Sequence, residues 1–323
     1  MLQPFIQVSV AGRPVSSAFY SRLVSASIHD APGQEADTVE LTFDDGDNMI
    51  AMPEEGAELS VSFGFRDGAG AFKMGVFIAE RTVIAGGADG QFLTISGRSA
   101  DMRSDIKEPL SEHFEDQTVG EIVEQLAGRH GYGVKVDADF ASLRLPYIAR
   151  FEQGATDFLT RLGDRIGAIF AVKDRKFLLV KRGGLPAVTI ARGECESWSF
   201  EVEPRPRYGS AEAAYFDRAN GRLIFEEHST GLGGARKRLR TIYASPEEAR
   251  AAARAEGERL ARCTGTGSLT LAGRPDIMAD QSINVVGFRA EVNGLWRCAG
   301  VDHVYDDTYR TTIELEAPET GKT

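Results

Sequence analysis

The segment 43–48, FDDGDN, gathers three carboxylates and one amide around a single glycine. Oxygen-rich loops of this kind bind Ca²⁺, because this hard cation prefers about six to eight oxygen ligands. The EF-hand spacing fails, however. Counting from Asp44 places Met49 at the glycine position, and counting from Asp45 places Gly56 where a bidentate Glu is required. Asp and Asn also cap their own turns and tolerate left-handed backbone, so the segment is predicted to be a turn without a metal ion.

Histidine and cysteine spacing gives no local metal motif. The chain has five histidines and three cysteines, and these form no HxxxH, HExxH or CxxC pattern. They are His29, His113, His130, His228 and His303, with Cys195, Cys263 and Cys298. The odd number and wide spacing of the cysteines favour reduced thiols in a cytoplasmic compartment over a disulfide framework. No metal-binding and no cofactor-binding residue is therefore predicted.

Motifs for catalysis also fail on inspection. GRSAD at 97–101 lacks the second glycine of a serine nucleophile elbow. GLGGARK at 231–237 lacks the last glycine of a dinucleotide fingerprint and lies between predicted strands. The adjacent carboxylates at 226–227 and 306–307 are more typical of solvated strand ends than of a glycosidase pair. No catalytic residue is predicted, and the chain is expected not to be an enzyme.

One basic cluster, ARKRLR at 235–240, interrupts an otherwise acidic chain. It could contact phosphate, or it could be an exposed strand whose Lys and Arg protect a sheet edge from mispairing. The net charge of −11 favours the second interpretation. The same acidity argues against a dedicated nucleic-acid binder and against docking on an anionic membrane. Trp198 and Trp296 lie in alternating strands and indicate core or rim packing rather than a carbohydrate platform.

Bulk composition is that of a globular protein. A length of 323 residues favours two or three domains, and 42% hydrophobic with 26% charged residues is ordinary for a soluble chain. The N-terminal sequence MLQPFIQVSV has neither the basic nor the apolar region of a secretory signal. No apolar run is long enough to span a bilayer, so no membrane insertion is expected.

Strand-period alternation dominates both ends of the chain. Residues 1–105 contain six short alternating runs separated by turn signals, which predicts a small barrel or sandwich. Strands return in 191–323 together with one helix, which Ser245 caps, Pro246 begins and Glu248 completes as a capping box. VSVAGRP and LTLAGRP, one in each region, are both predicted to be strands that end in the same turn, a weak sign of two related β-domains.

The middle region, 106–190, is predicted to be α+β. A helix opens with a capping box of Thr118 and Glu121 and is expected to stop at Gly128 and Gly131. A second helix, ATDFLTRLGDRIG, has apolar residues at helical spacing. AIFAV and FLLVKR flank the charged turn KDRK and predict a hairpin.

Three stretches carry a family resemblance: LVSASIHDAPGQEADTVELTFDD, YIARFEQGATDFLTRLGDRIGAIFAVKDRKFLLV and GFRAEVNGLWRCAGVDHVYDDTYRTTIELE. They resemble the bacteriophage late control gene D family, the baseplate hub proteins of contractile phage tails, related to the N-terminal part of the VgrG spike of type VI secretion. The middle stretch is the most specific. Arg150 stands where Gln is more usual, Asp280 occupies a common glycine position, and YDDTYRTT lacks the glycine pair often seen before the closing strand.

The resemblance implies a mainly β, α+β protein with two barrel-like antiparallel β-domains, 1–105 and 191–323, and an α+β insert, 106–190. Three chains would form a ring that joins a sixfold tail tube to a threefold central spike, with a tape-measure protein as a further candidate partner. DNA would pass without specific binding, so residues 236–240 are expected to face away from the channel. The expected location is the virion baseplate, after assembly in the host cytoplasm.

Other functions stay open at this point. A VgrG-like hub of a secretion or injection apparatus is the nearest alternative, and a spike domain would be expected to follow residue 323 in that case. A peptidoglycan-acting enzyme would need a catalytic constellation, and a glycan-binding module would need an exposed aromatic platform.

Overall fold

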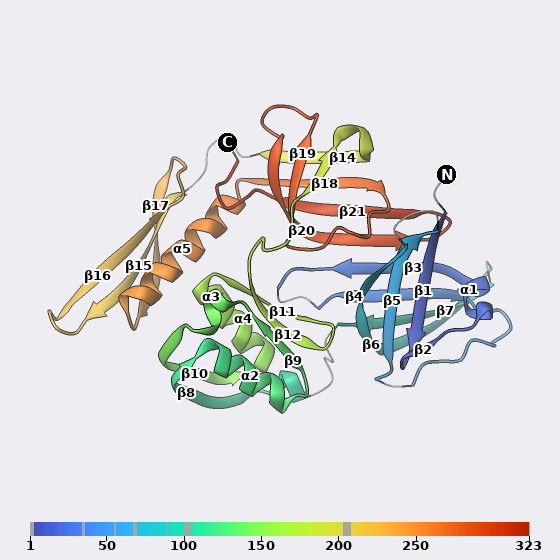
Figure 1. The fold of residues 1–323 in the computed structure, drawn as a ribbon, viewed down its shortest axis with the longest axis horizontal. Helices are drawn as coiled ribbons and strands as arrows, with labels where there is room; N and C mark the ends of the chain where they lie inside the picture. Colours follow the sequence, from blue (N-terminus) through green and yellow to red (C-terminus); the bar gives the residue numbers. More distant parts are fainter. Residues whose placement is uncertain are drawn as a thin grey trace.

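The computed structural model describes residues 3–33, 36–54, 56–66, 70–88, 90–99, 105–202 and 208–322. Within these ranges, no helix combines the length and the apolar character needed to cross a membrane. The protein is mainly β, with helices concentrated in the middle of the chain and at 246–262 (Figure 1). This agrees with the predicted mainly β, α+β class.

The elements have the following bounds. The strands are β1 (Pro4–Val10), β2 (Arg13–Pro14), β3 (Leu23–Asp30), β4 (Thr38–Asp44), β5 (Glu58–Phe65), β6 (Gly70–Gly87), β7 (Gly90–Arg98), β8 (Leu110–Thr118), β9 (Gly133–Val136), β10 (Arg144–Gln153), β11 (Ala168–Lys173), β12 (Lys176–Lys181), β13 (Val188–Ala191), β14 (Cys195–Val202), β15 (Tyr208–Asp217), β16 (Arg222–Ser229), β17 (Ala235–Tyr243), β18 (Gly265–Ala272), β19 (Ser282–Val286), β20 (Gly294–Tyr305) and β21 (Tyr309–Glu316). The helices are α1 (Ser17–Arg22), α2 (Val119–Arg129), α3 (Ala138–Ala141), α4 (Ala155–Ile166) and α5 (Pro246–Arg262), with 3₁₀ turns at Asp105–Lys107 and Arg192–Glu194.

One large sheet contains strands from both ends of the chain. Its order is β14-β18-β21-β20-β3-β4-β7-β6-β5-β1-β2, with β19 beside β20 and β13 beside β19, thirteen strands among the described residues. The N-terminal and C-terminal halves meet where β3 pairs antiparallel with β20, for example Ile28 opposite His303. The two predicted β-regions are therefore continuous at this pair of strands.

Each half of this sheet has its own hydrophobic core. Val39, Leu41 and Phe43 alternate with polar residues along β4 and are buried, as their period-2 spacing predicts. They join one core formed by β1 and β3 to β7, and the second core lies under β18 to β21 around Trp296. Burial of these side chains supplies the main driving force for folding of each half.

The insert follows its sequence signals closely. Thr118 accepts the N–H of Glu121, whose carboxylate accepts the N–H of Thr118, so the predicted capping box is present at the start of α2. Gly128 does not stop this helix, which runs through it to Arg129, while Gly131 just beyond has a left-handed φ of 70°. Helices α2 and α4 pack with β8 to β12 around a third core, and β11 and β12 form the predicted hairpin.

A small separate sheet, β16-β15-β17, lies at one end of the long axis of the molecule, with α5 along one of its faces (Figure 1). Ser245 caps α5 by accepting the N–H of Glu248, and Pro246 is its first residue, as predicted. The second half of the predicted capping box is wrong: the Glu248 carboxylate accepts the N–H of Ala244 instead and also pairs with Arg165 of α4. That pair attaches α5 to the insert.

Two details differ from the sequence prediction. Helix α1 was not predicted, because its six residues are too few to show a helical period. The two AGRP segments also do not share one turn. Ala11 and Gly12 have φ of 48° and 74°, whereas Ala272 and Gly273 are not left-handed. The domain boundaries at residues 105 and 190 stay a proposal. Strand β13 spans the second of these boundaries, since it begins at Val188 and pairs with β19 of the large sheet.

Candidate functional site

The acidic segment FDDGDN is a turn at the end of β4, as predicted. The N–H of Gly46 donates to Asp44 Oδ1 at 3.1 Å, and the N–H of Ile50 donates to Asp45 Oδ1 at 2.9 Å. Asn48 has a left-handed φ of 56°. The carboxylates of Asp44 and Asp45 thus bind the backbone of their own turn, which is the typical role of Asp there, while that of Asp47 binds Arg22 of α1. In the part of the chain that the structure describes, no group of three or more His, Cys, Asp or Glu side chains could hold a metal ion.

His303 is a core histidine. Its Nε2 lies 3.2 Å from the carbonyl oxygen of Ile277, and its Nδ1 lies 2.9 Å from the hydroxyl of Tyr309. Burial lowers the pKa of His303 to about 4, although nearby carboxylates including Asp30 oppose the shift. The ring is therefore neutral at pH 7, with Nε2–H donating to Ile277 and Nδ1 accepting from Tyr309. Its two nitrogens are engaged in packing rather than offered to a substrate.

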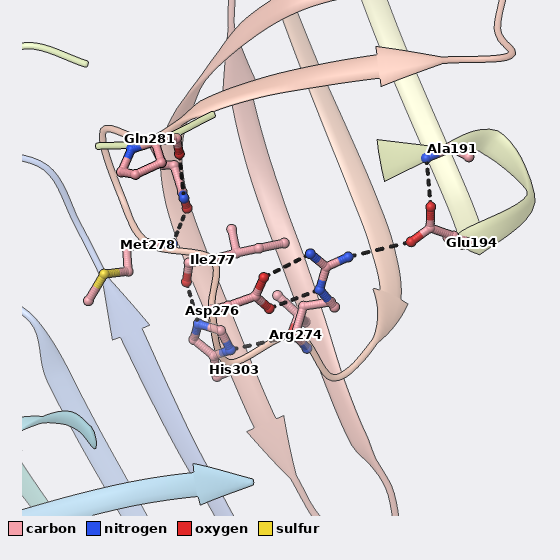
Figure 2. Close-up of polar contacts among 10 residues, drawn as sticks. Ala191, Glu194, Arg274, Asp276, Ile277, Met278, Gln281 and His303 are labelled. Carbon is pink, nitrogen blue, oxygen red and sulfur yellow. Dashed lines mark hydrogen bonds and ion pairs between the residues drawn. The ribbon is translucent and has the colours of Figure 1, made fainter. Parts of the chain in front are cut away.

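The connection between β18 and β19, residues 273–281, is held by a polar cluster (Figure 2). Arg274 donates two hydrogen bonds of 2.8 Å to the Asp276 carboxylate and reaches Glu194 at 3.4 Å. Glu194 in turn accepts the N–H of Ala191 at 2.9 Å. The hydrogen bonds from Arg274 lower the pKa of Asp276, so both groups of this pair stay charged at neutral pH.

The end of this connection is fixed as well. Gln281 accepts the N–H of Met278 and donates to the carbonyl of Pro186, at 3.1 and 2.8 Å (Figure 2). The N–H of Ala279 donates to Asp30 of β3 at 2.8 Å. The connection thus joins β3, β20 and the link from the insert into β14. We interpret the role of this cluster as structural, since its polar groups satisfy one another's hydrogen-bonding needs.

A buried ion-pair group joins the insert to the large sheet. The Lys173 ammonium at the end of β11 contacts the carboxylate of Asp30 and lies 3.2 Å from that of Asp37. Asp37 also accepts the N–H of Ala31 at 3.2 Å. Burial acts to raise the pKa of Asp30, but Lys173 outweighs it, and the net shift is downward. This group was not predictable from local spacing in the sequence, because Asp30 and Lys173 are 143 residues apart.

This group predicts a pH dependence of stability. Burial raises the pKa of Asp37 from 3.8 to about 7, with Lys173 opposing the shift and Asp30 adding to it. Between about pH 4 and 7 the unfolded chain has released this proton and the folded chain still holds it, so stability falls as pH rises. Relative to Asp37→Asn, the wild-type free energy of unfolding should drop by about 1–2 kcal/mol from pH 5 to pH 7. Urea unfolding of both proteins measures this, and a constant or growing difference would contradict it.

The basic cluster lies on β17, an edge strand of the small sheet, which confirms the exposed-edge interpretation. Arg236 and Arg238 both bind the buried carboxylate of Glu212 on β15, at 2.5 and 2.9 Å. Lys237 points to the other face and reaches Glu256 of α5 at 2.7 Å. Burial acts to raise the pKa of Glu212, but the two arginines outweigh it and lower that pKa. The cationic groups are held in fixed positions by charge-assisted hydrogen bonds.

The remaining sequence candidates are placed apart from one another. Trp296 is buried in the C-terminal core, whereas Trp198 lies at its rim, with the Arg192 guanidinium 4.8 Å from the ring centre. Glu226 pairs with Arg250 on α5. The cysteines are all free, with Cys298 buried, Cys195 partly buried and Cys263 exposed. His29 Nδ1 lies 2.7 Å from the Asp302 carboxylate, and the His113 ring stacks on Tyr147. Asp306 accepts a backbone N–H of its own turn, and Gly231–Gly234 lie between β16 and β17. Part of the segment 97–101 is outside the described residues.

The chain has relatives among known proteins. The chain is 27% and 26% identical to the probable baseplate hub proteins of Escherichia phages 186 and P2, in each case over 98% of this chain and 93% of the relative. No family model matches the chain.

Among solved structures, the 43 kDa tail protein of prophage MuSo2 from Shewanella oneidensis superposes with a TM-score of 0.75 at 14% identity, over 99% of this chain and 100% of that one. The E. coli c3393 protein, a component of the type VI secretion system, superposes with a TM-score of 0.60 at 12% identity, over 98% of this chain and 78% of that one. These two likenesses concern the fold. Together with the sequence relatives, they confirm the predicted resemblance: the chain is similar to the probable baseplate hub proteins of Escherichia phages 186 and P2.

Proposed function

We propose that this chain is a baseplate hub protein of a phage or prophage tail. The observation that carries the proposal is the similarity to two probable baseplate hub proteins over 98% of this chain. The alignment therefore includes the three hydrophobic cores described above and is not limited to one of them. The fold supports it physically. One chain supplies two β-cores side by side in a continuous sheet, so three chains would supply six. A closed threefold ring of such chains could meet a sixfold tube on one side and a threefold spike on the other.

The proposal includes a structural rather than enzymatic role. Two groups with strongly perturbed pKa values, Asp37 and His303, are engaged with Lys173, Tyr309 and backbone atoms inside packed junctions. Perturbed groups of this kind also occur in structural ion-pair networks, so they do not require a catalytic explanation. The expected partners are two further copies of the chain, the tail tube and the central spike, and the expected location is the virion baseplate.

A second candidate function is a VgrG-like hub of a secretion or injection apparatus. The fold shared with the E. coli c3393 protein favours it. The sequence relatives favour the phage tail, since both are phage proteins aligned over nearly their full lengths. Locating the protein by immunogold labelling of purified particles would distinguish the two. Label at the end of a phage tail supports the first function, and label only on a cell-envelope apparatus supports the second.

The oligomeric state tests the ring directly. Light scattering on the purified protein should give three times 35.1 kDa, about 105 kDa, at high concentration or when its tail partners are added. Closed ring symmetry requires this, because two-thirds of the ring is missing from one chain. A monomer at every concentration, with and without the spike protein, would contradict the hub function.

A further inference from the structure

The small sheet β16-β15-β17 carries large apolar side chains on both of its faces. Toward α5 the sheet presents Ala213, with Tyr215, Leu239 and Tyr243 around it, and these pack on three alanines of the helix. On the opposite face lie Phe216 of β15, Leu223 and Phe225 of β16 and Ile242 of β17, with exposed fractions between 41% and 56%. The pairing of Phe216 with Leu223, and of Ala214 between Phe225 and Ile242, places them on one surface, here called the outer face.

The outer face departs from the usual pattern. A sheet with one covered and one solvated side normally has apolar residues inward and polar residues outward. Figure 1 shows α5 on one side of this sheet and no other described element over its outer face. An apolar surface that is exposed on a single chain and rimmed by polar residues marks an interaction site. The outer face therefore needs an occupant that this chain does not supply to itself.

The outer face also carries cationic side chains along β17 that are held by ion pairs. The buried Glu212 binds both Arg236 and Arg238. The Arg238 guanidinium lies 4.3 Å from the ring centre of Phe225, so it is stacked on the apolar part of the face. Side chains that are already fixed lose less entropy when a partner binds. The occupant should thus be a protein surface that combines apolar side chains with carboxylates.

The charge distribution of the chain favours a second copy as such a partner. Residues 208–262 contain ten Lys and Arg against eight Asp and Glu, a net charge of +2, whereas the whole chain has 37 against 48 and a net charge of −11. The rest of the chain therefore has a net charge of −13. Opposite net charges on two parts of one chain favour head-to-tail contacts between copies, and such contacts form a ring where the rotation between copies closes.

We propose that the outer face of the β16-β15-β17 sheet is the surface on which a neighbouring copy of this chain docks, through an acidic and apolar surface of that copy. The proposal rests on the proposed hub function, since it assigns a specific contact to the ring. It also gives the cationic residues of β17 a role in assembly, which is distinct from phosphate binding.

The test combines Leu223→Glu with Ile242→Glu, which places two carboxylates on the outer face. At a concentration where the wild type is trimeric, the trimer fraction of this variant should fall at least tenfold by light scattering, with an unchanged far-ultraviolet circular dichroism spectrum. The matched control combines Arg250→Ala with Arg254→Ala on α5, which shifts the net charge by the same two units on exposed side chains away from the outer face. The control should remain trimeric.

A second measurement does not depend on the folding of that variant. A photo-crosslinking phenylalanine analogue at Phe216 should join two copies of the chain within assembled trimers, and mixed light and heavy isotope labels separate these links from links within one chain. Crosslinks to an acidic surface of another copy support the proposal. Links only within one chain, or only to a different protein such as the spike, overturn it. A wild type that is never trimeric contradicts the hub function, whereas a trimeric Leu223→Glu and Ile242→Glu variant overturns only the docking face.

Discussion

Replacement of Lys173 with methionine should lower the free energy of unfolding by about 3 kcal/mol. The substitution keeps the length of the side chain and removes its charge, which leaves the ionised carboxylate of Asp30 without its cation in a buried junction. Breaking a buried pair costs about 3–5 kcal/mol, because the remaining charge is no longer compensated. The Lys173 side chain is 29% exposed, which places the expected loss at the lower end of that range. Urea unfolding followed by circular dichroism measures the change.

The matched control is Lys73→Met. Lys73 pairs with Asp174 at 3.0 Å, but the two side chains are 50% and 46% exposed, and exposed pairs contribute about 0–1 kcal/mol. Adding Asp30→Asn and Asp37→Asn to the Lys173 variant should recover part of the loss, since no buried charge is then left unpaired. Equal losses in the Lys73 and Lys173 variants would show that burial does not decide the strength of the junction.

Local signals in the sequence predicted the local elements well. The alternation in β4 and the capping side chains Thr118 and Ser245 act over a few residues, so their spacing is visible without a structure. The union of the two β-regions was not predictable in the same way. It depends on β3 pairing with β20, and β-strand pairing over such a separation leaves no periodic signal. Lys173 was likewise assigned to a charged turn, because its partners lie in another part of the chain.

The candidate docking face was also missed, although part of its signal was present. RLIFEEHS and AYFDR have apolar residues on both alternating positions, which is unusual for a strand with one wet side. Which position faces a helix could not be decided until α5 was placed against Ala213 and not against Phe216. That the chain is not an enzyme, by contrast, stays a prediction, which activity assays must test.

In the two AGRP segments the same four residues have different structural roles. Gly12 lies in an open turn with φ of 74°, and a Cβ added there meets nothing within 4 Å. Gly273 has no left-handed backbone, but an added Cβ would lie 2.0 Å from Cδ1 and 2.3 Å from Cγ of Tyr309. Its N–H also donates to the Tyr309 carbonyl at 2.7 Å, which holds the two backbones together. One glycine supplies conformation and the other supplies space.

Gly273→Ala should therefore destabilise the protein by about 3 kcal/mol or more, and Gly12→Ala by only about 1 kcal/mol. The Tyr309 ring cannot move aside cheaply, because it is buried against Phe63 at 5.2 Å between ring centres and is hydrogen-bonded to His303. Urea unfolding of the two variants compares the costs directly. Combining Gly273→Ala with Tyr309→Ala should cost less than the sum of the single changes, because removal of the ring also removes the clash. A larger loss for Gly12→Ala than for Gly273→Ala would mean that backbone conformation, and not close approach of Tyr309, limits both positions.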